Sequence, residues 1–190
     1  MQLIVSDEGV NGLRLHVVNE TDQPLDVLLT LDCLADGRRP AASGEHAVTV
    51  PARGHYSVAA TTLLGAFFDA TYAYRFGPPA HDANVVRLID NGSGTLLQEA
   101  VHFPLGPGDA RHDLGLRAGV IREGESFYLK LAAERLAQTV VIDVAGFLPE
   151  DNYFHLAPGR DYLVALQALA STGTPKGTVS ALNGIGKISF

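Results

Sequence analysis

The acidic residues are the first place to look for chemistry, because two carboxyl groups about 5 Å apart can act as acid and nucleophile in glycoside hydrolysis. The nearest candidates in the sequence are Glu150-Asp151 and Glu123 with Glu125. Adjacent residues on a strand point to opposite faces, so Glu150 and Asp151 are not expected to converge. Glu123 and Glu125 flank Gly124 in a predicted turn, where carboxylates are solvated. The sequence therefore predicts no catalytic residues.

The histidines are the next candidates, since imidazole is a common metal ligand. None belongs to an HExxH motif, a close His pair or a His-Cys spacing of the kind that zinc sites use. His81 and His112 each precede an aspartate in a polar stretch. We therefore expect scattered surface histidines and no metal-binding residues. The seven are His16, His46, His55, His81, His102, His112 and His155.

We find no motif for a nucleophile or a phosphate. No serine lies in a Gly-x-Ser-x-Gly context, and Gly92-Ser93-Gly94 is typical of a turn. The C-terminal GIGK run, Gly184 to Lys187, lacks the spacing and the following helix of a P-loop. The single cysteine, Cys33, lies in an apolar alternation and is expected to be a buried small hydrophobe. The sequence predicts no cofactor and no cofactor-binding residues.

Composition limits the partners and the location. The chain has 190 residues, 18% of them charged, and a net charge of −7. A diffuse acidic balance disfavours nucleic acid and anionic membranes as partners. No apolar run reaches the roughly 18 residues that span a bilayer. The N-terminus lacks the basic segment followed by an apolar core that is typical of a signal peptide. This favours a cytoplasmic over a periplasmic or secreted location. The strand-like start also fits a piece of a longer protein.

The elements that must position any site repeat with period two, which is typical of β-strands. About eight strands at spacings of 8–12 residues precede the middle of the chain, the pattern of a β-sandwich. Residues 40–44 are expected to be a loop. Tyr72, Tyr74 and Phe76 are expected to form a buried stripe on one strand face. Predicted strands in this half include residues 13–18, 27–33, 46–50, 56–63, 70–76, 86–90 and 97–103.

The clearest linker is Pro104-Leu105-Gly106-Pro107-Gly108, because its prolines and glycines cannot continue a strand ladder. We place a domain boundary here, between a β-sandwich over residues 1–105 and a second one over residues 106–190. In the second half, residues 132–138 are expected to form a turn rather than a helix, and residues 171–177 a loop. Predicted strands follow at residues 114–120, 127–131, 139–144, 160–168 and 178–182.

A short aromatic segment, PEDNYFHLAPG at residues 149–159, is predicted to be a corner between two strands of the second sandwich. Asp151 and Asn152 favour a turn because their side chains bond nearby backbone, and Pro158-Gly159 closes the segment. Tyr153 is predicted to be largely buried, anchoring the sandwich through bonds to neighbouring backbone.

This corner also carries a family resemblance. The run Asp-Asn-Tyr-Phe, an acidic residue, Leu and Pro-Gly resembles the C-terminal immunoglobulin-like domain of β-mannosidases of glycoside hydrolase family 2, with His155 where that pattern has Asp. The strand and turn order of residues 9–38 and 125–159 is similar to that family, as is the strand before the linker at residues 96–106. The resemblance implies an all-β fold of two tandem immunoglobulin-like β-sandwich domains.

The catalytic unit of the resembled family is a (β/α)₈ barrel with two glutamates. The present sequence has no barrel pattern of alternating strands and long helices, and no position matches the catalytic motifs. The resemblance therefore implies a non-catalytic, structural region. Its partners would be the catalytic barrel and the other domains of the same parent chain.

Two alternatives stay open. One is an autonomous carbohydrate- or protein-binding β-sandwich module, and the other is an unrelated adhesion-type protein. If the chain instead belongs to a larger enzyme, part of its surface faces other domains, and we expect residues 3–5 or 65–68 to be exposed. A sugar platform would depend on tyrosines, since the chain has no tryptophan; the candidates are Tyr56, Tyr72, Tyr74, Tyr128, Tyr153 and Tyr162.

Overall fold

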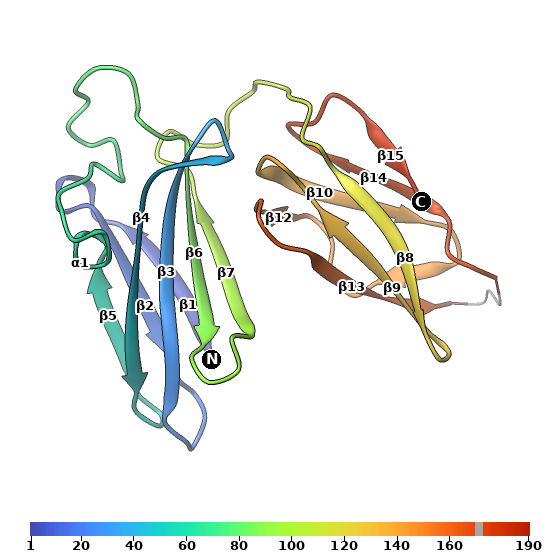
Figure 1. Cartoon of the computed structure of the whole chain (residues 1–190), viewed down its shortest axis with the longest axis horizontal. Helices are drawn as coiled ribbons and strands as arrows, with labels where there is room; N and C mark the ends of the chain where they lie inside the picture. The colour runs from blue at the N-terminus through green and yellow to red at the C-terminus, as the bar shows by residue number, and fades with distance from the viewer. Residues whose placement is uncertain (170–172) are drawn as a thin grey trace. The chain divides into compact units, whose positions relative to one another are not determined.

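The computed structural model describes residues 1–169 and 173–190 and is built almost entirely of antiparallel β-strands (Figure 1). The chain divides into two compact units, unit 1 from Met1 to Gly106 and unit 2 from Pro107 to Phe190. The expected all-β fold of immunoglobulin-like sandwiches is confirmed. No helix among the described residues is long and apolar enough to cross a bilayer. The predicted loop at 171–177 falls partly outside the described residues.

Unit 1 is a sandwich of a three-stranded and a four-stranded sheet. The first has the order β1-β2-β5, formed by Gln2–Asp7, Leu13–Val18 and His55–Ala59. The second has the order β4-β3-β6-β7, formed by Arg39–Val50, Leu25–Ala35, Ala83–Asp90 and Leu96–His102. A short 3₁₀ turn, Gly9–Asn11, joins β1 to β2, and one helix, α1, spans Ala60–Leu64.

The core of unit 1 follows from the period of its strands. On β3, Val27, Leu29, Leu31 and Cys33 alternate inward and are fully buried. The prediction for Cys33 is therefore confirmed. Because burial disfavours the thiolate, the pKa of Cys33 rises to about 12, and the thiol is inert as a nucleophile.

Three predictions for unit 1 are wrong. Residues 40–44 are part of β4 rather than a loop; proline at position 40 is tolerated because β4 is an edge strand of its sheet. Residues 60–63 form α1 rather than the end of a strand, and Gly65 ends that helix in a left-handed conformation at φ 67°. Residues 70–76 form no strand, because Tyr72 and Arg75 both adopt a φ of 55°, which a strand ladder does not permit.

Unit 2 packs two four-stranded sheets over a second core. One sheet has the order β12-β10-β14-β15, formed by Phe154–Leu156, Ala137–Val144, Gly177–Ala181 and Lys187–Ser189. The other has the order β11-β13-β9-β8, formed by Phe147–Pro149, Tyr162–Ala168, Ser126–Ala132 and Arg117–Glu123. The predicted turn at 132–138 is confirmed between β9 and β10. The strand β15 was not predicted, because three residues are too few to show a period.

The predicted corner at residues 149–159 contains a short strand, β12, and its first turn lies between β11 and β12; its anchor also differs from the predicted one. Tyr153 is 68% exposed, so the prediction that it is buried is wrong. Its φ of 64° places the residue in the left-handed region, while its N–H donates to Val140 O. The neighbouring Asn152 does the anchoring: its Oδ1 accepts from Ile142 N at 2.9 Å and its Nδ2 donates to Ile142 O at 3.0 Å. The amide side chain thus takes the place of a strand backbone beside β10.

Candidate functional site

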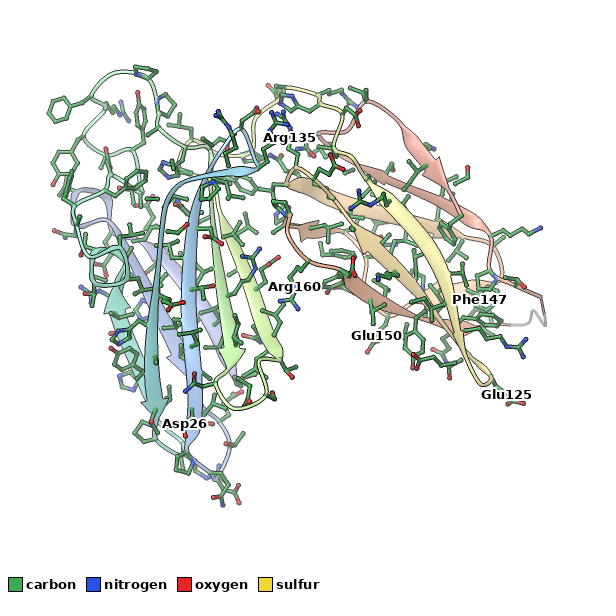
Figure 2. All side chains as sticks on the ribbon, viewed as in Figure 1. Asp26, Glu125, Arg135, Phe147, Glu150 and Arg160 are labelled. Atoms are coloured by element: carbon green, nitrogen blue, oxygen red, sulfur yellow. The ribbon has the colours of Figure 1, made fainter. Side chains whose placement is uncertain are left out.

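The acidic pairs considered for catalysis lie in two exposed turns of unit 2. Glu123 and Glu125 flank the tip of the β8–β9 hairpin, and Figure 2 shows Glu125 pointing away from it. Glu150 and Asp151 are exposed at the corner. There Asp151 Oδ2 accepts a hydrogen bond from the hydroxyl of Tyr162 at 3.1 Å, so this carboxylate stabilises the corner.

The histidines are distributed over both units, and no group of three or more His, Cys, Asp or Glu residues within 1–169 and 173–190 could hold a metal ion. One Ser-His contact does form across β1 and β2, where Ser6 Oγ lies 2.8 Å from His16 Nε2. A serine nucleophile requires a third group that orients the histidine. Among the described residues, His16 has no such hydrogen bond, so we assign this pair a cross-strand structural role.

Unit 1 brings together two of the histidines that were predicted to be scattered on the surface, and that prediction is wrong for His81, which is buried. Asn84 Nδ2 donates to Ala70 O at 2.8 Å and to His102 Nδ1 at 3.1 Å, and His81 Nε2 lies 3.2 Å from the same Ala70 O. His102 Nε2 is 3.3 Å from the carboxylate of Asp7. Burial is the largest influence on both imidazoles and lowers the pKa of His81 and of His102.

This polar cluster fixes the base of a long segment that we call the aromatic loop, residues 65–82, between α1 and β6. Inside the loop, the carboxylate of Asp69 accepts hydrogen bonds from the N–H groups of Ala73 and Tyr74, both at 2.9 Å. Thr71 Oγ1 donates to Gly9 O at 2.8 Å and ties the loop to the turn after β1. The loop is therefore ordered by its own hydrogen bonds rather than by a strand ladder.

Three aromatic rings stand on this loop in contact with one another. Phe67 is 69%, Tyr74 42% and Phe76 87% exposed. Phe67 meets Tyr74 edge to face with ring centroids 5.3 Å apart, and Tyr74 lies nearly parallel to Phe76 at 6.3 Å. The prediction that residues 3–5 or 65–68 are exposed is confirmed for residues 65–67, whereas Phe68 is half-buried and Leu3 is buried. The predicted buried stripe is wrong, because the left-handed residues of the loop direct the rings outward.

The two tyrosine hydroxyls of the aromatic loop are used within the fold itself. The hydroxyl of Tyr74 donates to Val10 O at 3.0 Å and that of Tyr72 to Gly77 O, so both phenols are held by backbone. What the loop offers a partner is apolar ring surface, which stacks on a sugar face or fills an apolar pocket of a protein. The sequence signal was the density of aromatic residues between Gly65 and Pro78, but strand periodicity masked it.

The fold and this site define a class of protein: tandem immunoglobulin-like β-sandwiches with an exposed aromatic loop. No protein-family model and no curated protein matches the sequence. Among solved structures, the chain is similar to a β-D-mannosidase from Dictyoglomus thermophilum, with a TM-score of 0.69 and 14% identity. That match covers 96% of this chain and 22% of the mannosidase, so the chain spans about a fifth of its length. A transglutaminase from red sea bream also matches, with a TM-score of 0.35, 16% identity and coverage of 99% of this chain and 30% of that one.

Proposed function

We propose that the chain is a non-catalytic C-terminal β-sandwich region of a β-mannosidase-like glycoside hydrolase, and that it supports a catalytic barrel carried by the same parent protein. The observation that carries the proposal is the extent of the structural similarity. It includes both units at once, over 96% of the chain, yet takes up only 22% of a β-mannosidase. That share, about a fifth of the mannosidase, supports the proposal of a region that accompanies a catalytic unit.

The aromatic loop is the surface that would face the rest of the parent protein. Interfaces between domains typically bury about 600–1,500 Å², and aromatic side chains are their usual anchors. Phe67 and Phe76 protrude from a loop whose backbone is already ordered, so docking costs little conformational entropy. An apolar pocket on the barrel or a neighbouring domain is the partner this surface fits.

The first test is the activity of the chain by itself. Purified protein is expected to leave a nitrophenyl β-mannoside unhydrolysed, with an intact β-mannosidase as the positive control. Metal-independent hydrolysis that co-purifies with the chain through two columns would overturn the proposal.

The second test is the size of the native polypeptide. An antibody against this chain should detect, in the source cell, a protein several times larger than its 20.1 kDa that carries β-mannosidase activity. Detection of only a 20 kDa species would favour an autonomous module.

One observation favours that alternative function. Tyr74 and Phe76 lie within 23° of parallel and are 42% and 87% exposed, and exposed aromatic rings are what a sugar-binding platform requires. Titration with mannose and β-mannan fragments separates the two functions. Binding that disappears in Phe76→Ala supports a carbohydrate module, whereas the scaffold proposal expects no binding of either sugar.

A further inference from the structure

Unit 2 contains a groove that no part of the proposed function uses. It has a volume of about 400 Å³ and lies on the outer face of the sheet formed by β10, β14 and β15. Val140 and Ile142 are buried in the core, so Val141 between them faces outward, where it pairs with Ser180 of β14. Ser180 in turn pairs with Lys187 of β15. These three side chains form the floor of the groove.

The charge of the groove is opposite to that of the chain. Arg111 and Lys187 line it, and none of the described residues that line it is acidic, although the protein as a whole carries −7. Arg111 Nη1 donates to Gly184 O at 3.3 Å, and among the described residues its guanidinium makes no other hydrogen bond. Within the described residues, the ammonium of Lys187 has no carboxylate partner. Two cations without counter-ions in one concave site favour an anion.

The groove also contains two side-chain hydroxyl groups that could bind a ligand. In the part of the chain that the structure describes, the hydroxyls of Thr139 and Ser180 make no hydrogen bond. Thr139 has a φ of 49°, a left-handed conformation that β-branched residues rarely adopt. It sits at the bulge of β10, and its N–H donates to His155 Nδ1 at 3.2 Å. Strained residues and bulges occur preferentially where a side chain is aimed at a ligand.

The wall of the groove is fixed before any ligand arrives. The side chain of Asn183 accepts from Gln138 N at 2.8 Å and donates to Leu136 O at 2.9 Å. Asn183 O accepts from His112 N at 2.9 Å, and Ile185 N donates to His112 O at 3.1 Å. These bonds hold the chain beside Arg111 against the turn that carries Ile185, which is 70% exposed at the rim. A pre-ordered site of this kind loses little entropy on binding.

We propose that this groove binds a carboxylate-bearing ligand of the size of a sugar acid. The guanidinium of Arg111 and the ammonium of Lys187 would take the carboxylate, since charge-assisted bonds to an anion are the strongest available here. Thr139 and Ser180 would meet ligand hydroxyls, and Val141 with Ile185 would contact the apolar ring face. The volume is within the range of small-molecule sites.

The test is a titration of the full chain with glucuronate, mannose and inorganic phosphate at low ionic strength, followed by amide NMR shifts. Glucuronate should shift Thr139, Ser180 and Gly184–Lys187 saturably, and added salt should weaken the binding. The double variant Arg111→Gln, Lys187→Gln should lose about tenfold or more in affinity, a loss of at least one charge-assisted contact. Lys176→Gln, an exposed lysine of the same unit outside the groove, should bind as the unaltered chain does.

Three outcomes would overturn the proposal: shifts from mannose equal to those from glucuronate, tighter binding of phosphate than of glucuronate, or undiminished binding by the double variant. An unchanged amide spectrum away from the groove shows that the double variant is folded. Should it not fold, Ser180→Ala replaces it, and an unaltered affinity for glucuronate in that variant also counts against the site. Because the full chain is assayed without any added catalytic domain, these results do not depend on the proposed scaffold function.

Discussion

At the scale of single residues, the amide side chain of Asn152 determines the geometry of the corner in unit 2. The backbone pairing of β10 with β12 ends at Val140 and Phe154. Beyond that point the side chain of Asn152 makes two hydrogen bonds to the backbone of Ile142 in place of a strand. The aromatic residue beside it, Tyr153, contributes little because its ring is solvated. The most conspicuous residue of the motif is therefore not the one that stabilises it.

We expect Asn152→Ala to lower the free energy of unfolding of unit 2 by about 1–3 kcal/mol, since both backbone groups of Ile142 lose a partner. Tyr153→Ala is the matched control and should cost less than about 0.5 kcal/mol, as exposed substitutions do. Urea unfolding with hydrogen exchange read on peptides of β10 measures both. A larger loss in Tyr153→Ala than in Asn152→Ala contradicts this account.

The buried histidines of unit 1 give its stability a pH dependence. Burial lowers the pKa of His81 and of His102 in the folded state. In the unfolded chain the same two imidazoles take up protons near the ordinary histidine pKa of about 6.5, whereas in the folded chain they stay neutral to a lower pH. Stability from this source is complete above the ordinary histidine pKa and is lost as the pH falls below it. Protonation of His102 Nδ1 would also remove the acceptor for Asn84 Nδ2.

We therefore expect the urea midpoint of unit 1 to fall between pH 7 and pH 5, the range in which free histidine titrates. His102→Gln should reduce the slope of stability against pH. His55→Gln, at an exposed position, should leave that slope unchanged. If the urea midpoint is constant over this range, the folded and unfolded chains bind the same number of protons. Burial then does not lower the pKa of either histidine, and the prediction is wrong.

At the scale of elements, α1 crosses the edge strand β4 at a single glycine. A Cβ on Gly44 would lie 2.0 Å from Leu63 O and 2.4 Å from the Leu63 carbonyl carbon, both backbone atoms. Neither can move without displacing the helix. This close approach partly covers the long edge of β4, which would otherwise present free backbone groups to another strand.

Gly44→Ala should thus destabilise unit 1 by about 1–3 kcal/mol, the usual cost of overpacking. Gly92→Ala is the control in the same unit, because its new Cβ would meet only the Asp90 carboxylate at 3.5 Å. Thermal unfolding by circular dichroism, with hydrogen exchange on α1 peptides, distinguishes the two. Equal melting temperatures would mean that α1 can leave the strand at no cost.

At the scale of the whole molecule, the two units each have their own sheets and core, and the linker joins them at Gly106. Leu105 is 63% exposed within it. Exposed connections with little hydrogen bonding are where proteases cut folded proteins. The predicted boundary between residues 105 and 106 is testable on this basis.

Limited thermolysin digestion is expected to cut first beside Leu105 and to give two fragments that keep their strand content. Leu105→Gly should remove that first cut. Mass spectrometry of the early products identifies the site. A first cut inside the aromatic loop would show that this loop is less protected from the protease than the linker at Leu105. That result would count against the predicted domain boundary between residues 105 and 106.

The sequence by itself determined most of the strands and their inward faces. Alternation is a local property, and the set Val27, Leu29, Leu31 and Cys33 is readable from period two alone. The Gly-Pro content of the linker is equally local. The sequence also indicated an all-β fold, because no long helical period competes with those strands, and the family resemblance implied that the sandwiches are immunoglobulin-like.

Only the tertiary structure decided where the exposed functional surfaces lie. The sequence of the aromatic loop alternates like a strand, but Tyr72 and Arg75 take positive φ values in the structure. There the Asp69 carboxylate accepts a hydrogen bond from the backbone of the loop, and Ala70 O accepts one from the side chain of Asn84. The groove of unit 2 joins Arg111 to Lys187 across 76 positions of the chain. Such contacts depend on which strands become neighbours, and sheet order is set by packing between distant segments rather than by any local pattern.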